Sequence, residues 1–210
     1  MEKLIKRGAE ADILLGWWGP LRAVFKVRRA KPYMVTELDL KLRKARTIRE
    51  ASVIPHARKA GANTPYIFYV GIRTFTIVMQ YIDGPTMKEM LDDKPVLAAE
   101  LGRTLSKLHS AGIIHGDPNT ANFILSDANR LWYTVDFGLS FFSSELEDIA
   151  VDIHIVKEML AAQHKRVFQE AFNYFLTGYS ETAGQYGLTQ ILKKLNEIER
   201  RGRYGRQLVD

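Results

Sequence analysis

The apolar pattern of this 210-residue chain changes near residue 82, and that change constrains the fold more than any other feature. Residues 12–28 and 66–82 are short apolar runs rich in β-branched and aromatic side chains, a pattern typical of antiparallel strands joined by turns. From residue 95 onward the apolar residues recur mainly at helical spacing. The sequence therefore predicts an α+β protein with a small β-rich first part and a mainly helical second part.

One prominent helix is predicted inside the β-rich part. The segment from Thr36 to Ala60 is rich in helix-forming residues, and Leu38, Leu42 and Ala45 recur at helical spacing. Pro55 predicts a kink or a boundary near the end of that helix, since proline removes a helical hydrogen bond. The first part is thus expected to be a small antiparallel sheet with one main helix.

The second part combines helices with one hairpin. Residues 95–109 form an amphipathic pattern that ends at Gly112, a residue common just beyond helix ends. The runs "NFILS" and "LWYTVDF", separated by the turn signal "DANR", predict a short hairpin. Further helices are predicted at residues 149–161, 166–176 and 188–201.

These patterns divide the chain into two lobes that together form one domain. We expect a lobe of residues 1–82 and a lobe of residues 83–210, meeting near residues 81–85. Clefts between lobes are common ligand sites, so the junction is the place to look for chemistry.

The composition excludes several classes of site, and the start of the sequence and its apolar runs argue against secretion and a membrane span. The chain has no cysteine, which excludes disulfides, thiolate metal sites and cysteine nucleophiles. Its start, "MEKLIKRGAE", is charged too early for a secretory signal, and no apolar run approaches the roughly 18 residues of a membrane span. We therefore expect a cytoplasmic protein with no membrane partner.

The net charge of +6 comes from clustered basic residues. Any one cluster is ordinary as a solvated surface, but several in a small chain favour a polyanionic partner. The clusters lie at residues 22–31, 41–49 and 200–206.

A group of carboxylates and one carboxamide indicates phosphoryl transfer. Asp117 and Asn122 lie five positions apart in "HGDPNTAN", and Asp136 follows in "VDFG", across the predicted hairpin. The oxygens of Asn122 and Asp136 suit Mg²⁺, which completes its shell with waters and phosphates. Asp117 would then be free to orient or deprotonate a hydroxyl or a water beside a γ-phosphate.

The segments "GIIHGDPNTANFIL" and "TVDFGLS" resemble the catalytic loop and the DFG motif of the protein-kinase-like fold. The resemblance implies ATP and Mg²⁺ as cofactors, with Asp117 as a catalytic residue and Asn122 and Asp136 as metal ligands. It also implies a strand lysine, held by a helix glutamate, that grips the α- and β-phosphates. Lys26 in "AVFKVRR" and Glu50 in "ARTIREA" match that pair.

The same resemblance implies the rest of the nucleotide site. "RGAEADIL" stands where kinases have a glycine-rich loop, although it contains one glycine, so backbone amides would cradle the phosphates with less conformational freedom. The strand end "VMQYIDG" would place one side chain behind the adenine and backbone groups beside it. The expected residues are Gly8, Ala9, Glu10 and Ala11 for the phosphates, Met79 behind the adenine, and Gln80, Tyr81 and Ile82 as its hydrogen-bond partners.

Departures from ordinary protein kinases narrow the family. Gly116 replaces the arginine that binds a phosphorylated activation loop. The four residues after Asp117 contain no lysine that could contact the γ-phosphate. No peptide-docking platform follows the DFG motif. The sequence is similar over almost its whole length to the small atypical kinase of the KEOPS complex, the PRPK family. The segments that carry this similarity are "RGAEA", "ELDLKLRKARTIREA", "HGD", "EDIAVD" and "RRGRYGRQLVD".

Membership of that family implies an ATP-using subunit of an assembly that makes threonylcarbamoyladenosine in tRNA. Its members are described as serine/threonine kinases that autophosphorylate, but the departures above favour ATP hydrolysis as the main role, with protein phosphorylation secondary. The implied partners are a catalytic subunit of actin-like fold, a small accessory subunit and tRNA. The basic tail would contact tRNA through Arg200, Arg201, Arg203 and Arg206.

Two alternatives remain open. A small-molecule phosphotransferase of the aminoglycoside or choline type also uses HGDxxxxN, although the short first lobe argues against it. A pseudokinase scaffold would bind partners without turnover, but it would not need all five of Lys26, Glu50, Asp117, Asn122 and Asp136. The other histidines singled out, His56, His154 and His164, lack ligand-like neighbours in sequence and are expected to be structural.

Overall fold

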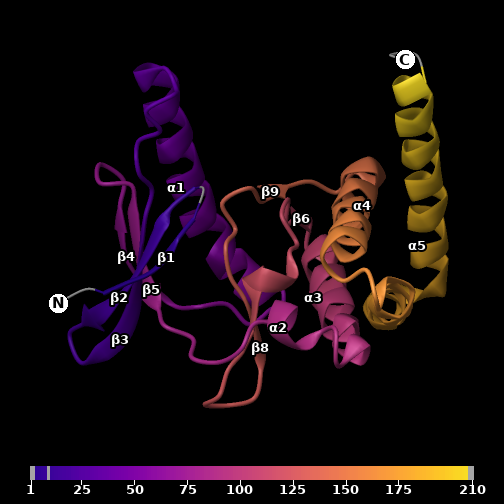
Figure 1. The fold of residues 1–210 in the computed structure, drawn as a ribbon, viewed down its shortest axis with the longest axis horizontal. Coiled ribbons are helices and arrows are strands. Elements are labelled where there is room, and N and C mark those ends of the chain that lie inside the picture. The colour runs from indigo at the N-terminus through magenta and orange to yellow at the C-terminus, as the bar shows by residue number, and fades with distance from the viewer. Residues whose placement is uncertain (1–2, 9, 208–210) are drawn as a thin grey trace.

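The computed structural model describes residues 3–8 and 10–207, and its first part is an antiparallel sheet (Figure 1). The sheet has five strands in the order β1-β2-β3-β5-β4. Helix α1 lies beside it and runs toward the helical part of the molecule. The bounds are β1 Lys3–Arg7, β2 Asp12–Trp18, β3 Leu21–Val27, α1 Thr36–Lys59, β4 Ile67–Gly71 and β5 Thr76–Gln80.

The expected strands are present as two hairpins, and one further strand was not predicted. β2 and β3 pair through a two-residue turn in which Gly19 has a positive φ of 59°. β1 pairs with β2 although all five of its residues are exposed. Because neither face of β1 is buried, its sequence carries no apolar alternation from which it could have been recognised.

Helix α1 differs from expectation at Pro55. The helix continues through this proline to Lys59, so the predicted boundary is wrong. Its buried side includes Glu50, Val53, Ile54 and Ala57, which face the protein interior on either side of the exposed proline. Burial of these neighbours offsets the single hydrogen bond that proline removes.

The second part is mainly helical, with two short strand pairs (Figure 1). Strands β7 and β8 form the hairpin that the sequence predicts, and β6 pairs with β9. The bounds are α2 Met87–Met90, η1 Pro95–Leu97, α3 Ala98–Ser110, β6 Ile113–Ile114, η2 Thr120–Asn122, β7 Phe123–Leu125, β8 Trp132–Thr134, β9 Phe141–Phe142, α4 Leu146–Gln163 and α5 Phe168–Gln207.

Helix α5 replaces the last two predicted helices and part of the predicted tail. It is interrupted at Gly184, which has a positive φ of 71°, and resumes at once rather than after a loop. The basic residues 200–206 therefore lie within this helix and not in a tail beyond it. No helix in the described ranges is long and apolar enough to cross a membrane.

Close packing of α3 on α5 builds the core of the helical part. Leu101, Leu105 and Leu108 are fully buried, and each such side chain contributes about 1.5–3 kcal/mol. A Cβ added at Gly102 would lie 2.1 Å from the Phe175 carbonyl oxygen, which is closer than atoms can approach. The two helix backbones therefore meet where glycine allows it, and this rigid pair supports the loops that follow α3.

Candidate active site

Two adjoining cavities lie where the sheet meets the helical part. The larger, of about 480 Å³, is lined by residues of both parts, and the smaller has about 260 Å³. Lys26, Asn122 and Asp136 line both cavities. The larger one also contains Glu50, Met79, Gln80, Tyr81 and Ile82 in its wall, and the smaller contains Gly8, Glu10, Ala11 and Asp117. Ala9, also predicted for this site, lies outside the described residues.

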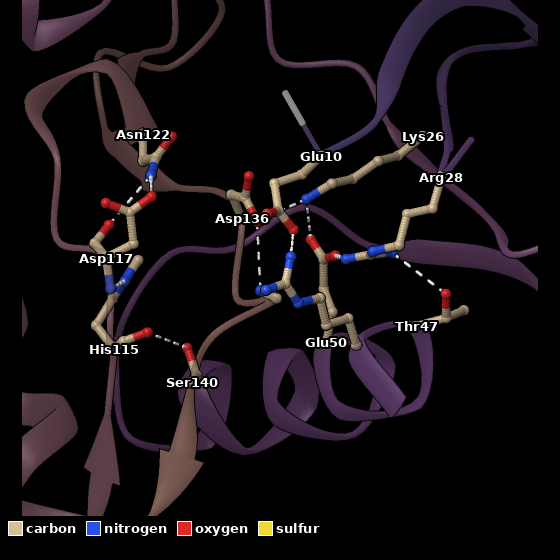
Figure 2. Close-up of polar contacts among 12 residues, drawn as sticks. Glu10, Lys26, Arg28, Thr47, Glu50, His115, Asp117, Asn122, Asp136 and Ser140 are labelled. Atoms are coloured by element: carbon tan, nitrogen blue, oxygen red, sulfur yellow. Dashed lines mark hydrogen bonds and ion pairs between the residues drawn. The ribbon is translucent and has the colours of Figure 1, made fainter. Parts of the chain in front are cut away.

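Lys26 lies between two carboxylates at the boundary of these cavities (Figure 2). Its Nζ is 2.9 Å from Oε1 of Glu50 and 2.7 Å from Oδ1 of Asp136. Lys26 is buried on β3, and Glu50 is fully buried on α1. The predicted lysine and glutamate are thus in contact, and the lysine also bridges to the DFG aspartate in the second part of the chain.

Arg28 is a part of this network that sequence reasoning missed. It was assigned to a basic surface cluster, but it is 3% exposed and its Nη2 binds Oε2 of Glu50. Its Nη1 also donates to Thr47, so two helix residues hold it. Side chains two positions apart share a strand face, and the spacing from Lys26 to Arg28 was the available signal.

Asp136 has a backbone conformation that is uncommon for residues other than glycine. Its φ is +66°, and its Oδ1 accepts a hydrogen bond from the Gly138 amide. Burial alone would raise the pKa of the Asp136 carboxyl, but the Lys26 ammonium, the Gly138 amide and Arg28 together outweigh that effect, and the pKa is lowered. A Cβ at Gly138 would lie 2.9 Å from Nη2 of Arg28, so a larger residue there would have to displace the end of the Arg28 side chain.

The catalytic-loop candidates Asp117 and Asn122 contact each other directly (Figure 2). The Asn122 amide nitrogen donates to the backbone oxygen of Asp117 at 3.1 Å and to its Oδ2 at 3.4 Å. This bonding turns the Asn122 side-chain oxygen away from Asp117. The amide oxygen is therefore available to a ligand on the side of the cavities.

Buried Asp152 of α4 anchors the start of this loop. Its carboxylate accepts the backbone N–H groups of His115 and Gly116, each at 2.9 Å. Its pKa is lowered, because the hydrogen bond from His109 and the backbone donors outweigh the effect of burial. Gly116 has a φ of +79°, and a Cβ there would lie 2.5 Å from the Leu139 carbonyl oxygen. Backbone packing thus explains the glycine that replaces the kinase arginine.

The His115 ring is neutral structural support for the same loop. It is fully buried between Phe123 and Phe137, and burial lowers its pKa. Its Nδ1 accepts the Asp117 backbone N–H at 3.3 Å. The Ser140 hydroxyl donates to the His115 carbonyl at 2.7 Å and ties the loop to the segment after the DFG motif.

The loop over the smaller cavity is tied to α1 and to itself. The Gly8 amide donates to the Ala11 carbonyl at 3.0 Å, so this N–H is already used within the loop. The Glu10 carboxylate forms ion pairs with Arg46 of α1 and with Lys31. Glu10 therefore contributes a tether through its side chain, which the sequence did not predict.

The strand end at the junction offers fewer free groups than expected. The Gln80 backbone N–H donates to the Tyr66 carbonyl at 2.8 Å, and the Tyr81 backbone N–H donates to the Arg22 carbonyl at 3.3 Å. Among the bonds of the described residues, none uses the Ile82 amide. Met79 is buried and contributes to the cavity wall. The N–H of Ile82 is thus the donor left for a ligand in this stretch.

The side-chain oxygens at the site suit a hard cation whose coordination shell also includes phosphate oxygens. The Asn122 amide oxygen and the Asp136 carboxylate are oxygen ligands on the wall of both cavities. Within the described ranges there is no group of three or more His, Cys, Asp or Glu that could form a complete protein cage. Mg²⁺ is bound in this way, through one or two protein oxygens plus waters and substrate phosphates.

Comparisons with known proteins identify related sequences. The sequence model of a family described as lipopolysaccharide core biosynthesis protein (WaaY) matches residues 55–137, less than half of the chain. The chain is 42% identical to KEOPS complex subunit Bud32 of Pyrococcus abyssi, over 96% of both proteins. It is 36% identical to a probable bifunctional tRNA threonylcarbamoyladenosine biosynthesis protein of Methanosphaera stadtmanae, covering 97% of this chain but 37% of that longer protein.

Two solved structures share the fold. One is the Rio2 kinase in its ADP/Mg²⁺-phosphoaspartate complex from Chaetomium thermophilum, with a TM-score of 0.61, 16% identity, and coverage of 97% of this chain and 72% of that one. The other is WaaP in complex with acyl carrier protein, with a TM-score of 0.63, 13% identity, and coverage of 97% and 88%. The predicted fold class, α+β and protein-kinase-like, is confirmed.

Proposed function

The chain belongs to the Bud32 family of KEOPS complex subunits, and we propose that it uses ATP and Mg²⁺ to support the threonylcarbamoyladenosine modification of tRNA. The observation that carries the proposal is the Lys26 ammonium, held between Glu50 and Asp136 at the wall that both cavities share. A cation fixed in this way suits the phosphates of a nucleotide.

The adenosine of ATP would occupy the larger cavity, whose walls include apolar side chains of Met79, Ile124 and Val135. The free N–H of Ile82 is a suitable donor for the adenine ring. The phosphates would extend past Lys26 into the smaller cavity, beneath the loop that contains Gly8 and Ala11. The two volumes together are in the range of sites that bury a ligand of this size.

Asn122 and Asp136 would hold the Mg²⁺, which neutralises charge on the phosphates when bound. Asp136 keeps its negative charge at neutral pH because its pKa is lowered. Asp117, fixed by the Asn122 amide, would orient the attacking hydroxyl or water and accept its proton. In this arrangement Lys26 binds the α- and β-phosphates, and Glu50 keeps the lysine in place.

ATP hydrolysis is the preferred activity, with serine/threonine phosphorylation, including autophosphorylation, as a secondary one. The residues between Asp117 and Asn122 include no lysine for the γ-phosphate. Helix α4 begins at Leu146, ten positions after Asp136, which leaves a short segment for docking a peptide. A water is a smaller acceptor that this site can accommodate.

The proposed partners are a catalytic subunit of actin-like fold, a small accessory subunit and tRNA. The basic end of α5 is the proposed tRNA contact, through Arg200, Arg201, Arg203 and Arg206. Arg201 is exposed and makes an ion pair with Glu147 at 3.2 Å. An exposed pair of this kind is weak enough for a phosphate to replace it.

The test compares wild type with Asp136→Asn and Asp117→Asn, for ATP hydrolysis and for phosphate transfer to protein, with and without the partner subunits and tRNA. Asp136→Asn should abolish Mg²⁺-dependent turnover, and Asp117→Asn should reduce it by about 10²-fold or more, as expected for loss of a general base. The exposed Asp127, paired weakly with Arg130, provides the matched control Asp127→Asn. Unchanged turnover in either site variant would contradict the assignment.

A further inference from the structure

The Thr120 hydroxyl is a buried polar group that the proposed chemistry does not use. Thr120 lies in the short 3₁₀ turn η2, between Asp117 and Asn122, and is fully buried. Its Oγ1 is 3.0 Å from Nε2 of His164 and 3.6 Å from the sulfur of Met159. The catalytic loop thus has a second side-chain anchor, distinct from Asp152.

His164 is placed to accept a hydrogen bond from the Thr120 hydroxyl. It follows the last residue of α4, is 2% exposed, and its Nδ1 lies 2.7 Å from Oδ1 of Asp92. A carboxylate can only accept, so Nδ1 carries the proton and donates it to Asp92. In the neutral ring Nε2 is then unprotonated, and the Thr120 hydroxyl donates to it.

The order Asp92, His164, Thr120 is that of a hydrolytic triad, but burial excludes that role. Thr120 is 0% exposed and lines neither of the two cavities. No substrate carbonyl could reach its oxygen, whereas a nucleophile must meet its substrate at hydrogen-bond distance. The hydrogen-bonded group of Asp92, His164 and Thr120 therefore has a structural role within the protein.

Resting on the proposed function, we propose that His164 is a positioning residue for phosphoryl transfer, which acts through Thr120 to fix the Asp117–Asn122 turn. Asp152 ties the start of the loop to the body of α4, and His164 ties the far end of the loop to the C-terminal end of the same helix. Between these anchors the Asn119 N–H donates to the Asp117 carbonyl at 2.8 Å, and beyond Thr120 the Asn122 N–H donates to the Asn119 carbonyl at 2.8 Å. One rigid helix thereby sets the separation of the two groups that would meet the nucleophile and the metal.

The first experiment compares Thr120→Val, which removes the hydroxyl at nearly constant shape, with Thr120→Ser, which keeps it. We expect Thr120→Val to lower kcat for ATP about tenfold, since a misplacement of 1 Å can cost about 100-fold, with KM changed less than about twofold. Thr120→Ser should recover most of the rate. His164→Asn keeps a donor toward Asp92 but has nothing at the Nε2 position, so it should match Thr120→Val.

Ser106→Ala is the control for loss of a buried hydroxyl, because the Ser106 oxygen on α3 is buried and has no hydrogen-bond partner among residues 3–8 and 10–207. Its kcat should equal that of wild type. If Thr120→Val turns over ATP like wild type while Asp136→Asn is inactive, the positioning role is wrong and the proposed function stands.

A second measurement decides the inference even if the wild type shows no turnover. Nuclear magnetic resonance should find neutral His164 protonated on Nδ1, and the Asn122 side-chain amide protons displaced by their bond to Asp117. That displacement should diminish in Thr120→Val and His164→Asn and persist in Thr120→Ser. A neutral ring protonated on Nε2, or amide signals that do not change in Thr120→Val, would overturn the proposal.

Discussion

Glu50 shows at the scale of one residue how a buried charge is stabilised here. It is fully buried and has two cationic partners, Lys26 on one oxygen and Arg28 on the other. The ammonium also bridges to Asp136, whereas the guanidinium is 3% exposed and lines neither active-site cavity. We infer that Lys26 binds the nucleotide and that Arg28 stabilises the fold.

Arg28→Met should therefore destabilise the protein by about 3–5 kcal/mol, the usual cost of breaking a buried ion pair from one side. The measurement is the free energy of unfolding in urea. Arg22→Met is the control, because Arg22 pairs with Asp83 on the surface and such pairs contribute about 0–1 kcal/mol. Equal losses in the two variants would show that Glu50 does not depend on Arg28.

His115 predicts a pH dependence of stability. Its folded pKa lies below the ordinary value near 6.5 because the ring is buried, so below that pH the unfolded chain binds a proton that the folded chain does not. Stability is thus fully present above about pH 6.5 and falls as the pH decreases, by at most about 1.4 kcal/mol per pH unit from this group. His115→Asn keeps an acceptor near the Asp117 amide and should flatten the decrease between pH 7.5 and 5. An identical slope in the variant would assign the titration to other histidines.

At the scale of elements, the loop between β1 and β2 is held to α1 by charge. Glu10 lies in the wall of the smaller cavity and is neutralised by Arg46 and Lys31. Arg46→Ala would leave its carboxylate facing the expected phosphates with less compensation, so we expect ATP to bind several-fold more weakly. Adding Glu10→Gln should restore most of the affinity, which nucleotide titration would measure. No recovery in the double variant would mean that Arg46 acts on the nucleotide directly.

The sequence was sufficient for elements with a strong periodic pattern and insufficient for those set by tertiary contact. The amphipathic helix α3 and the β7–β8 hairpin were predictable from their apolar residues. Fully exposed β1 has no such pattern, and the continuation of α1 past Pro55 depends on burial of its neighbours. At the site, resemblance identified the lysine and glutamate that are found in contact, and their catalytic roles remain predictions. The contacts of Asp152 and His164 with the loop could not be predicted, because each joins residues about 40 positions apart in the sequence.

At the scale of the whole molecule, the sheet with α1 and the helical part contribute different residues to the candidate site. The sheet and α1 supply Lys26, Glu50 and the loop, and the helical part supplies Asp117, Asn122 and Asp136. In Figure 1, α4 and α5 lie on the side of the molecule away from the sheet, and α5 extends to the C-terminal end. A tRNA bound at that end would lie beyond the helices that support the catalytic loop.

The last prediction concerns the basic end of α5 as a tRNA contact. Substituting glutamine for Arg200, Arg201, Arg203 and Arg206 removes four charges while keeping a residue that favours helix, which a deletion would not do. The assembled complex should bind tRNA more weakly, and the slope of log affinity against log salt should decrease by about 0.7–0.9 for each phosphate that the variant no longer neutralises. The matched control removes four exposed charges from α1, at Lys41, Lys44, Arg49 and Lys59, and should leave that slope unchanged. A decrease in the control alone would move the tRNA contact to α1, and equal decreases in both would indicate a general effect of net charge rather than a contact made by α5.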